Sequence, residues 1–431
     1  MKSTIRTRRF GAPFVAVTAA TTALLVLSGC TSTDADAGGP TEITFSYLWG
    51  GAEGEGVEKI IADFNASQDD IVVKGVSSPD SQAQLTAMSA SQGSFDISDN
   101  FGNGVGSWAS KGIIAPLDDY METYGIDADD FVPAAMEQMT YDGKIYSMPI
   151  AIHDYQLVYN KDLLDAAGVE VPTTTDELAD AIEKLTVQEA DGTITQLGFG
   201  DPSISTTLTT LGYAFGGEWN DADGPTPTDP GNIAAAEWYQ DSITNKFGAA
   251  NIADFVSGVG QYMSPEDPFY TGKYAMVIDG SWQANGIAVN APELDWGVTS
   301  IPVPSSELEG STQLTASTLF IPANSKHKEE AAEFMAYLVS EDGMLAFAKA
   351  LGNLPSRTSL LDSDEFSSIV GLDTWLAALK SPNVKALSSA PYSAEYTTDL
   401  GAAFDDITRD ANTPEDALAA VADKIDGYAK N

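Results

Sequence analysis

Apolar residues along the chain switch repeatedly between strand-like and helix-like spacing, starting after residue 40. Glu42 to Leu48 alternates and is rich in β-forming residues, Val57 to Phe64 has helical spacing, and Ile71 to Val76 predicts a second strand. Together these runs predict a β-α-β opening. Helical spacing recurs in four later runs, at Ser81 to Ala90, Asp176 to Leu185, Asn232 to Thr244 and Lys328 to Val339. Strands that alternate with helices predict an α/β protein rather than an all-β or all-α one.

The middle of the chain holds a proline within an apolar run. Asp142-Gly143 predicts a tight turn, and Ile145 to Ile152 is the apolar run that contains Pro149. Because proline cannot donate a backbone hydrogen bond to a sheet, we expect this run to form a hinge rather than a central strand. A short strand at Gln156 to Tyr159 should follow, and then a helix that opens after Asn160.

Three polar or amphipathic residues, His153, Asp154 and Tyr155, come directly after the apolar run. If the chain crosses from one lobe to another at a hinge, these side chains would line the cleft between the two lobes. They are therefore candidate ligand-binding residues.

The first 29 residues predict an export signal. A basic segment up to Arg9 precedes an apolar core at Phe14 to Leu27, and Leu27-Ser28-Gly29-Cys30 closes it. The core is too short and too rich in Ala and Thr for a membrane span. The closing tetrad resembles a lipobox, which implies cleavage before Cys30 and lipidation of Cys30 at the outer face of the cell membrane; a buried structural thiol is the alternative. Residues 30–40 then form the lipidated cysteine and a flexible tether.

The composition is strongly acidic. The chain has 63 Asp and Glu against 21 Lys and Arg, a formal net charge of −42. Removal of the leader takes away basic residues only, so the imbalance grows. Nucleic acid is excluded as a partner, because its phosphates require Lys and Arg.

Enzyme motifs are missing from the sequence. It contains no G-x-S-x-G, no H-E-x-x-H and no G-x-x-x-x-G-K-[ST], and the glycine-rich run at Gly102 to Gly106 lacks dinucleotide spacing and predicts a loop. The two histidines, His153 and His327, are far apart, which argues against zinc. Carboxylates are too abundant for a glycosidase pair to be singled out. We expect no enzymatic activity, no metal and no cofactor.

Three segments carry a resemblance to a known family. YDGKIYSMPIAIHDYQLVYNKDLLDAAGV from Tyr141 to Val169, FYTGKYAMVIDGSW from Phe269 to Trp282, and AAEFMAYLVSEDGMLAFAKALGNLPSR from Ala331 to Arg357 resemble the family 1 extracellular solute-binding proteins of ABC importers, the maltose-binding and related sugar-binding group. The similarity spans roughly residue 41 to the C-terminus. It implies a monomeric, two-lobed binding protein that delivers a sugar to a membrane permease driven by a separate ATPase.

The resemblance also implies the domain division, since chains of this family cross between the lobes more than once. Lobe 1 would comprise residues 41–148 and 302–345, and lobe 2 residues 151–300 and 346–430. The crossings would lie near Pro149-Ile150, Ile301-Pro302 and Leu345-Ala346.

The ligand is expected to be neutral or cationic, because only Arg357 and Arg409 follow Cys30 to pair with an anion. A sugar requires aromatic faces for its C–H surface and planar polar groups for its hydroxyls. Such residues follow predicted strands or the hinge, and the candidates are Trp49, Asp99, Asn100, Tyr155, Trp282 and Gln283. The family resemblance favours Trp282 as the stacking platform and adds Arg357 as a residue that faces the cleft.

Other aromatic residues are weaker candidates or are assigned to packing. Trp219 and Tyr396 join His153 and Asp154 as the weaker candidates, whereas we expect Trp108, Trp238, Trp296 and Trp375 to be packed. Fewer aromatics than in maltodextrin binders suggest a monosaccharide or short oligosaccharide.

Three alternatives remain open. The ligand could be a polyol, a glycoside or a cationic compound, or the protein could be a lipid-anchored hydrolase or a surface adhesion protein. Asp221-Ala222-Asp223-Gly224, in the loop at 220–230, resembles part of a calcium site but lacks the remaining ligands.

Overall fold

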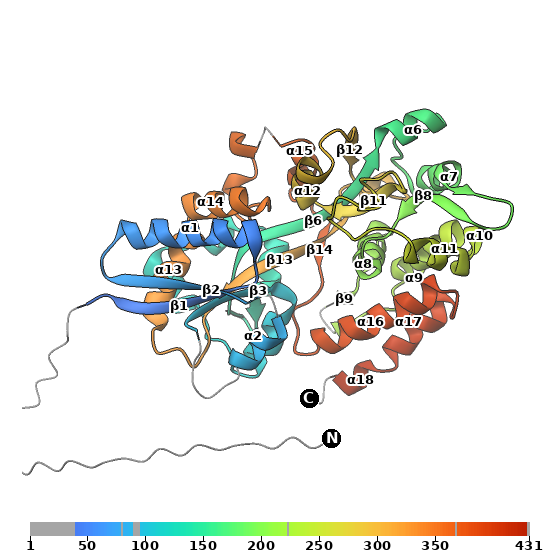
Figure 1. The fold of residues 1–431 in the computed structure, drawn as a ribbon. Helices are drawn as coiled ribbons and strands as arrows, with labels where there is room; N and C mark the ends of the chain where they lie inside the picture. The colour runs from blue at the N-terminus through green and yellow to red at the C-terminus, as the bar shows by residue number, and fades with distance from the viewer. Residues whose placement is uncertain (1–38, 79–80, 89–94, 222–223, 367–368, 429–431) are drawn as a thin grey trace, which may run out of the picture. The chain divides into compact units, whose positions relative to one another are not determined.

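The described strands assemble into one large mixed sheet. The computed structural model describes residues 39–431 apart from 79–80, 89–94, 222–223, 367–368 and 429–431 (Figure 1). The strands are β1 (Thr41–Tyr47), β2 (Ile71–Ser77), β3 (Ile97–Phe101), β6 (Met148–Asn160), β7 (Val187–Gln188), β8 (Ile194–Gly200), β11 (Tyr274–Gly280), β12 (Trp296–Thr299), β13 (Thr312–Phe320) and β14 (Val384–Ala386). Their order is β2-β1-β3-β13-β6-β11-β8-β7, with β12 paired to β6 and β14 to β13. Two short hairpins, β4–β5 (Thr140–Tyr141 and Lys144–Ile145) and β9–β10 (Asn220–Asp221 and Gly224–Pro225), stand apart from it.

Helices pack around this sheet, which confirms the α/β prediction. They are α1 (Gly51–Ser67), α2 (Ser81–Met88), α3 (Val105–Ser110), α4 (Asp118–Tyr124), α5 (Pro133–Met139), α6 (Lys161–Ala167), α7 (Thr175–Leu185), α8 (Ile204–Ala214), α9 (Pro230–Tyr239), α10 (Asn245–Phe247), α11 (Ala249–Ser257), α12 (Trp282–Asn290), α13 (Lys328–Leu338), α14 (Glu341–Leu351), α15 (Leu372–Ala378), α16 (Ser393–Thr408), α17 (Pro414–Ala422) and α18 (Ile425–Tyr428). Figure 1 shows α1 and α14 side by side along β1 and β2, whereas α8, α9, α16 and α17 gather beyond β11 and β8.

The predicted elements are confirmed where local pattern was strong. β1 pairs in parallel with β2 and α1 connects them, as the β-α-β opening requires. The four later helical runs form α2, α7, α9 with a π-helical continuation at Gln240–Thr244, and α13. In α7 the predicted run begins at a capping box between Thr174 and Glu177, and Leu178, Ile182 and Leu185 are buried along one face.

The expectation that the run around Pro149 would not form a central strand is wrong. Pro149 lies near the start of β6, a strand of 13 residues at the centre of the sheet that pairs with β13, β11 and β12. It is tolerated because the β13 register shifts between Ser317 and Thr318, and Thr318 is the residue opposite Pro149. The turn at Asp142-Gly143 and the helix after Asn160 are confirmed: both turn residues have positive φ, and the Asn160 side chain caps α6.

The glycine-rich run at Gly102 to Gly106 is helical, contrary to the predicted loop. Gly102–Gly104 forms a 3-10 turn, and α3 begins at Val105. A Cβ on Gly106 would lie 1.7 Å from the carbonyl oxygen of Ser389. The glycine is therefore required by the close approach of a second backbone, and the run does not open a nucleotide-binding loop.

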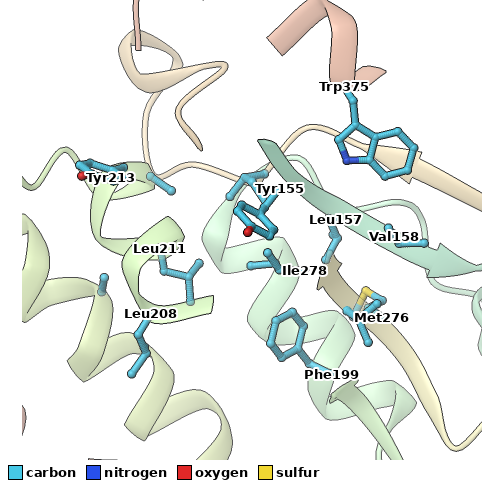
Figure 2. Packing of buried hydrophobic residues seen from close by; sticks show 14 of the residues in the cluster. Tyr155, Leu157, Val158, Phe199, Leu208, Leu211, Tyr213, Met276, Ile278 and Trp375 are labelled. Carbon is cyan, nitrogen blue, oxygen red and sulfur yellow. The ribbon is translucent and has the colours of Figure 1, made fainter. Parts of the chain in front are cut away.

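Two large hydrophobic cores flank the sheet and meet along β6. The first contains residues of β1, α1 and α13 and includes Ile150 and Ala151. The second contains residues of β8, β11 and α8, residues of β6 from Ile152 onward, and Val132, Ala135 and Met139 at α5. Figure 2 shows its centre, where Leu157 and Phe199 pack together with Met276 and Ile278. Side chains of β6 thus change from one core to the other between Ala151 and Ile152. Residues 40–431 nevertheless form one compact unit.

The tryptophans assigned to packing are mostly confirmed. Trp108, Trp296 and Trp375 are buried. Trp238 is only partly buried; its indole lies against Phe215 and its Nε1 donates to the Thr175 carbonyl at 3.2 Å. Cys30, the tether up to residue 38 and residues 222–223 of the calcium-like fragment lie outside the described residues.

Candidate ligand-binding site

A polar stripe crosses the centre of the sheet where the two cores meet. β13 pairs antiparallel with β6 so that Thr315 lies opposite His153. Because side chains alternate between faces, His153 and Tyr155 share a face with Thr315 and Ser317. The Tyr155 hydroxyl is 3.3 Å from Thr315 Oγ1, and His153 Nε2 is 3.4 Å from Ser317 Oγ. Polar and aromatic groups therefore lie together on one face at the middle of the sheet.

Trp282 completes this stripe from the next strand. β11 ends at Gly280, which lies opposite Tyr155 on β6, and Trp282 is the first residue of α12. Its ring stands edge-on to His153 and Tyr155, with centroids 5.4 and 5.8 Å apart. A Cβ on Gly280 would lie 2.2 Å from the indole, so only glycine admits this position. We call His153, Tyr155 and Trp282 the aromatic corner.

A buried carboxylate orients the indole through a hydrogen-bond relay. The Trp282 Nε1 donates to the Tyr262 hydroxyl at 2.5 Å, and that hydroxyl donates to Asp279 at 2.9 Å. Gln283 Nε2 donates to the same carboxylate at 2.6 Å, and the Tyr270 hydroxyl donates to Gln283 Oε1 at 2.9 Å. Burial raises the pKa of Asp279 to about 6. The partly exposed indole is therefore fixed by its neighbours rather than free to rotate.

A cavity of about 160 Å³ opens beside Tyr155. Its walls come from β3, the turn after it, α5, β6, β13 and the segment that follows β14. Besides Tyr155 they include Phe101, Asn103, Gln138, Gln313, Thr315 and Leu387. Phe101 is 52% exposed, which is unusual for a phenylalanine beside a polar cavity.

Of the predicted site residues, the structure brings four together. His153 and Tyr155 lie in β6, and Trp282 and Gln283 open α12. Asp154 is next to them in sequence but its side chain points to the opposite face, where Asp154 Oδ2 accepts from Gln156 at 2.6 Å. Burial lowers the pKa of His153 to about 4, so the imidazole is neutral at pH 7.

Asp99 and Asn100 lie inside β3, and not after a strand as predicted. The strand begins at Ile97 because that residue pairs with Phe45 of β1, while Asn100 pairs with Thr318 of β13. Asp99 is buried and accepts from the Leu48 amide at 2.8 Å. Burial raises the pKa of both Asp99 and Asp154 well above the ordinary value, which favours their neutral acid forms.

Trp49 packs against the first core, and Arg357 forms an ion pair within the protein. Trp49 is partly buried and its ring packs edge-on against Phe347 at 4.9 Å. Arg357 pairs with Asp130 at 2.5 Å and donates to a backbone carbonyl at 2.6 Å, so its guanidinium is occupied within the fold. The structure does not bring either residue into the aromatic corner.

The weaker candidates Trp219 and Tyr396 lie buried in the second core. Trp219 is 1% exposed and its Nε1 donates to the Thr209 carbonyl. The Tyr396 hydroxyl donates to the Trp219 carbonyl at 2.7 Å. Both polar groups are satisfied inside the protein, which leaves neither of them for a ligand.

The sequence reasoning missed Gln313, Thr315, Gln138 and Tyr262. A usable signal existed for β13, where polar Gln313, Thr315 and Ser317 alternate with apolar residues at strand spacing. No comparable signal marks Gln138, which sits in a short helix, or Tyr262, which lies in a loop. Tertiary contacts alone bring these two residues to the site.

The described residues contain neither a candidate metal cluster nor a candidate membrane span. There, no group of three or more His, Cys, Asp or Glu side chains could hold a metal ion. The same part of the chain contains no helix that is both long and apolar enough to cross a membrane.

Ligand sites often lie between the structural units of a protein, and aromatic and amide groups gather here where the two cores meet. The chain belongs to the bacterial extracellular solute-binding proteins, whose family model matches residues 59–374. A binding protein of Brucella abortus is 28% identical over 75% of this chain and 77% of its own length. The diacetylchitobiose-binding protein DasA of Streptomyces coelicolor is 28% identical over 65% of this chain and 64% of its own. A solved structure, CpMnBP1 with mannobiose bound, is 26% identical with a TM-score of 0.77, covering 89% of this chain and 99% of that one.

Proposed function

We propose that this protein captures a neutral carbohydrate, a monosaccharide or short oligosaccharide, at the aromatic corner. The observation that carries the proposal is the partly exposed Trp282 indole, which is held edge-on to Tyr155 and tied through Tyr262 to Asp279. A fixed aromatic face suits the C–H surface of a sugar ring, and nearby hydroxyl and amide groups suit its hydroxyls. The names of two relatives, which bind diacetylchitobiose and mannobiose, support the same ligand class.

The state of the arginines and of His153 supports a neutral ligand. Arg357 and Arg409, the arginines that follow Cys30, pair with Asp130 and Asp405. His153 is neutral at pH 7 because burial lowers its pKa. A phosphate or carboxylate ligand would therefore lack the guanidinium groups that normally bind it.

The ligand is proposed to bridge two lobes with the boundaries expected from the sequence, residues 41–148 with 302–345 and residues 151–300 with 346–430. The change of hydrophobic core between Ala151 and Ile152 on β6 supports a division there. A ligand that contacts both lobes would stabilise a closed form, which then docks on a membrane permease with its own ATPase.

Anchoring through Cys30 is proposed from the Leu27-Ser28-Gly29-Cys30 tetrad alone. We expect the mature protein to begin at an acylated Cys30 and to partition with membranes. Cys30→Ala should release a folded, soluble protein. Intact-mass analysis that finds an unmodified Met1 or an unacylated Cys30 in the native host would reject the anchor.

A thermal-shift screen tests the proposed ligand class. Mannobiose, diacetylchitobiose and maltotriose are compared with a polyol, a polyamine and a sugar phosphate. Binding to the native state raises the unfolding temperature by mass action, so at least one neutral sugar should raise it without product formation. A shift by the polyamine or the sugar phosphate alone would contradict the proposal, and release of cleaved sugar would identify a hydrolase instead.

A further inference from the structure

A second cavity, of about 200 Å³, lies among the end of α11, the loop that follows it and the turn after β8. Four apolar or aromatic residues of its wall keep accessible surface. Val256 and Tyr262 are 44% and 45% exposed, and Pro202 and Val259 are half-buried. Apolar side chains that are exposed together around a hollow are a feature of ligand-binding sites.

The polar side chains in the wall are already bonded within the protein. Asp201, Asp267 and Gln283 line the cavity. Each of their side-chain oxygens accepts a hydrogen bond from another part of the chain, at 2.6 to 3.2 Å, and the Gln283 amide donates to Asp279 at 2.6 Å. A sugar hydroxyl would exchange water for few partners there, whereas an apolar group loses nothing on entry. The cavity therefore suits an apolar group.

The loop that carries Tyr262 is fixed by its own contacts. The next residue, Met263, has a positive φ of 59°, and its amide donates to Asp267 at 2.6 Å. A Cβ on Gly260 would lie 1.9 Å from the Glu266 carbonyl oxygen, so the two ends of the loop approach closely. A residue other than glycine keeps such a backbone conformation only where its surroundings impose it. The wall formed by this loop is therefore rigid.

Tyr262 connects this cavity to the aromatic corner. It lines the cavity, while its hydroxyl accepts from Trp282 Nε1 at 2.5 Å; Gln283, the residue after Trp282, lines the cavity as well. We infer that the cavity holds an uncharged aromatic aglycone carried by the sugar that stacks on Trp282. This inference rests on the proposed carbohydrate function and specifies the ligand as an aryl glycoside.

The size and the lining of the cavity agree with a single aromatic ring. An apolar cavity of roughly 150 Å³ is large enough for benzene, and this one is somewhat larger. Tyr262 offers its own ring to a planar group, and aromatic pairs gain more than their buried area alone provides.

The test compares phenyl and methyl glycosides, in both anomers, of mannobiose, diacetylchitobiose and maltotriose by calorimetric titration. The phenyl glycoside of the bound sugar should bind about tenfold more tightly than the methyl glycoside, because the added ring enters the cavity. Its binding should also show a more negative heat-capacity change, since the ring leaves water for an apolar wall. Free phenol is included in a parallel thermal-unfolding experiment.

Val256→Asp tests where the ring lies. Val256 is exposed in the last turn of α11, so the substitution should leave the fold intact while it places a charge at the cavity. The phenyl glycoside should then bind no more tightly than the methyl glycoside, whose affinity should be unchanged. Val187→Asp is the matched control, because Val187 is 45% exposed on β7 and is not part of this wall. It should keep the tenfold difference.

Each other outcome decides the question. If the wild type binds the free sugars but gains nothing from a phenyl group, the inference is refuted while the proposed function stands. A tenfold gain that survives in Val256→Asp places the ring elsewhere and also refutes it. If phenol raises the unfolding temperature while the phenyl glycoside gains no affinity, the cavity takes a free aromatic compound instead. A protein that binds none of the sugars or their glycosides overturns the proposed function and the inference together.

Discussion

Truncation of Trp282 to alanine should remove most of the binding energy while leaving the fold intact. The indole is partly exposed, and its contacts with His153, Tyr155 and Tyr262 hold one face toward the proposed ligand. Because the side chain packs against the second core without being buried in it, its loss creates no large internal cavity. The substitution should therefore affect affinity far more than stability.

The size of the effect follows from the area the ring can cover. A sugar stacked on one face would shield roughly 100 Å² of an indole, about half of what a tryptophan buries in full. At about 25 cal/mol per Å² this contributes about 2.5 kcal/mol, or on the order of a sixtyfold change in Kd. A central aromatic contact that also excludes water falls in the same range, about 2 kcal/mol or more.

Trp238→Ala is the matched control. Trp238 is also partly buried, but it packs against Phe215 and donates to the Thr175 carbonyl in a separate part of the second core. Its truncation should cost roughly 2 kcal/mol of unfolding free energy, less than the 3 to 5 kcal/mol typical of a fully buried tryptophan, and should leave Kd unchanged.

Calorimetric titration with the sugar that gives the largest thermal shift, combined with denaturant unfolding, separates the two variants. Unchanged affinity in Trp282→Ala would mean that the site is misplaced. Equal weakening in both variants would mean that tryptophan loss acts through general destabilisation and that stacking is not the cause.

Three further predictions test the surroundings of the corner. Burial raises the pKa of Asp279 to about 6, so this group stabilises the fold at pH 4 and that contribution is lost as pH rises through 6. In denaturant titrations from pH 4 to 7, Asp279→Asn should reduce the fall in unfolding free energy by up to roughly 3 kcal/mol. If the unfolding free energy of the variant falls as steeply with pH as that of the wild type, the assignment is refuted. Gly280→Ala places a methyl group 2.2 Å from the Trp282 ring, so it should displace the indole and weaken sugar binding about tenfold. Normal sugar affinity in this variant would show that the position of the indole is not critical. Sugar affinity should change less than about twofold between low and high salt, because a neutral ligand has no charge to screen, whereas a steep loss would indicate an ionic ligand.

Helices and strands were predicted well where the apolar residues of a segment followed a single helix-like or strand-like spacing. α7 could be assigned because Thr174 and Glu177 form a capping box ahead of buried residues at helical spacing. Trp282 could be placed because a β-rich run ends at a glycine just before it. The strand at Pro149 was not predicted, because proline is tolerated there only through a register shift in β13, a strand more than 160 residues away in sequence.

The sequence did not predict which candidate side chains are buried or which residues they contact. Trp219 was a weaker ligand-binding candidate, but its indole packs against α8, where a Cβ on Gly212 would touch it. Arg357 was expected to face the cleft, but Asp130, 227 residues earlier in the chain, pairs with it. Gln138 had no local signal because its neighbours at Gly102 and Leu387 come from distant segments.

A crystal structure of the complex with the most stabilising neutral sugar tests the central claim most directly. We predict that one sugar ring lies over the Trp282 indole beside Tyr155 and that the sugar extends into the cavity lined by Tyr155 and Thr315. A sugar bound elsewhere, with the indole of Trp282 uncovered and the cavity beside Tyr155 empty, would contradict the account.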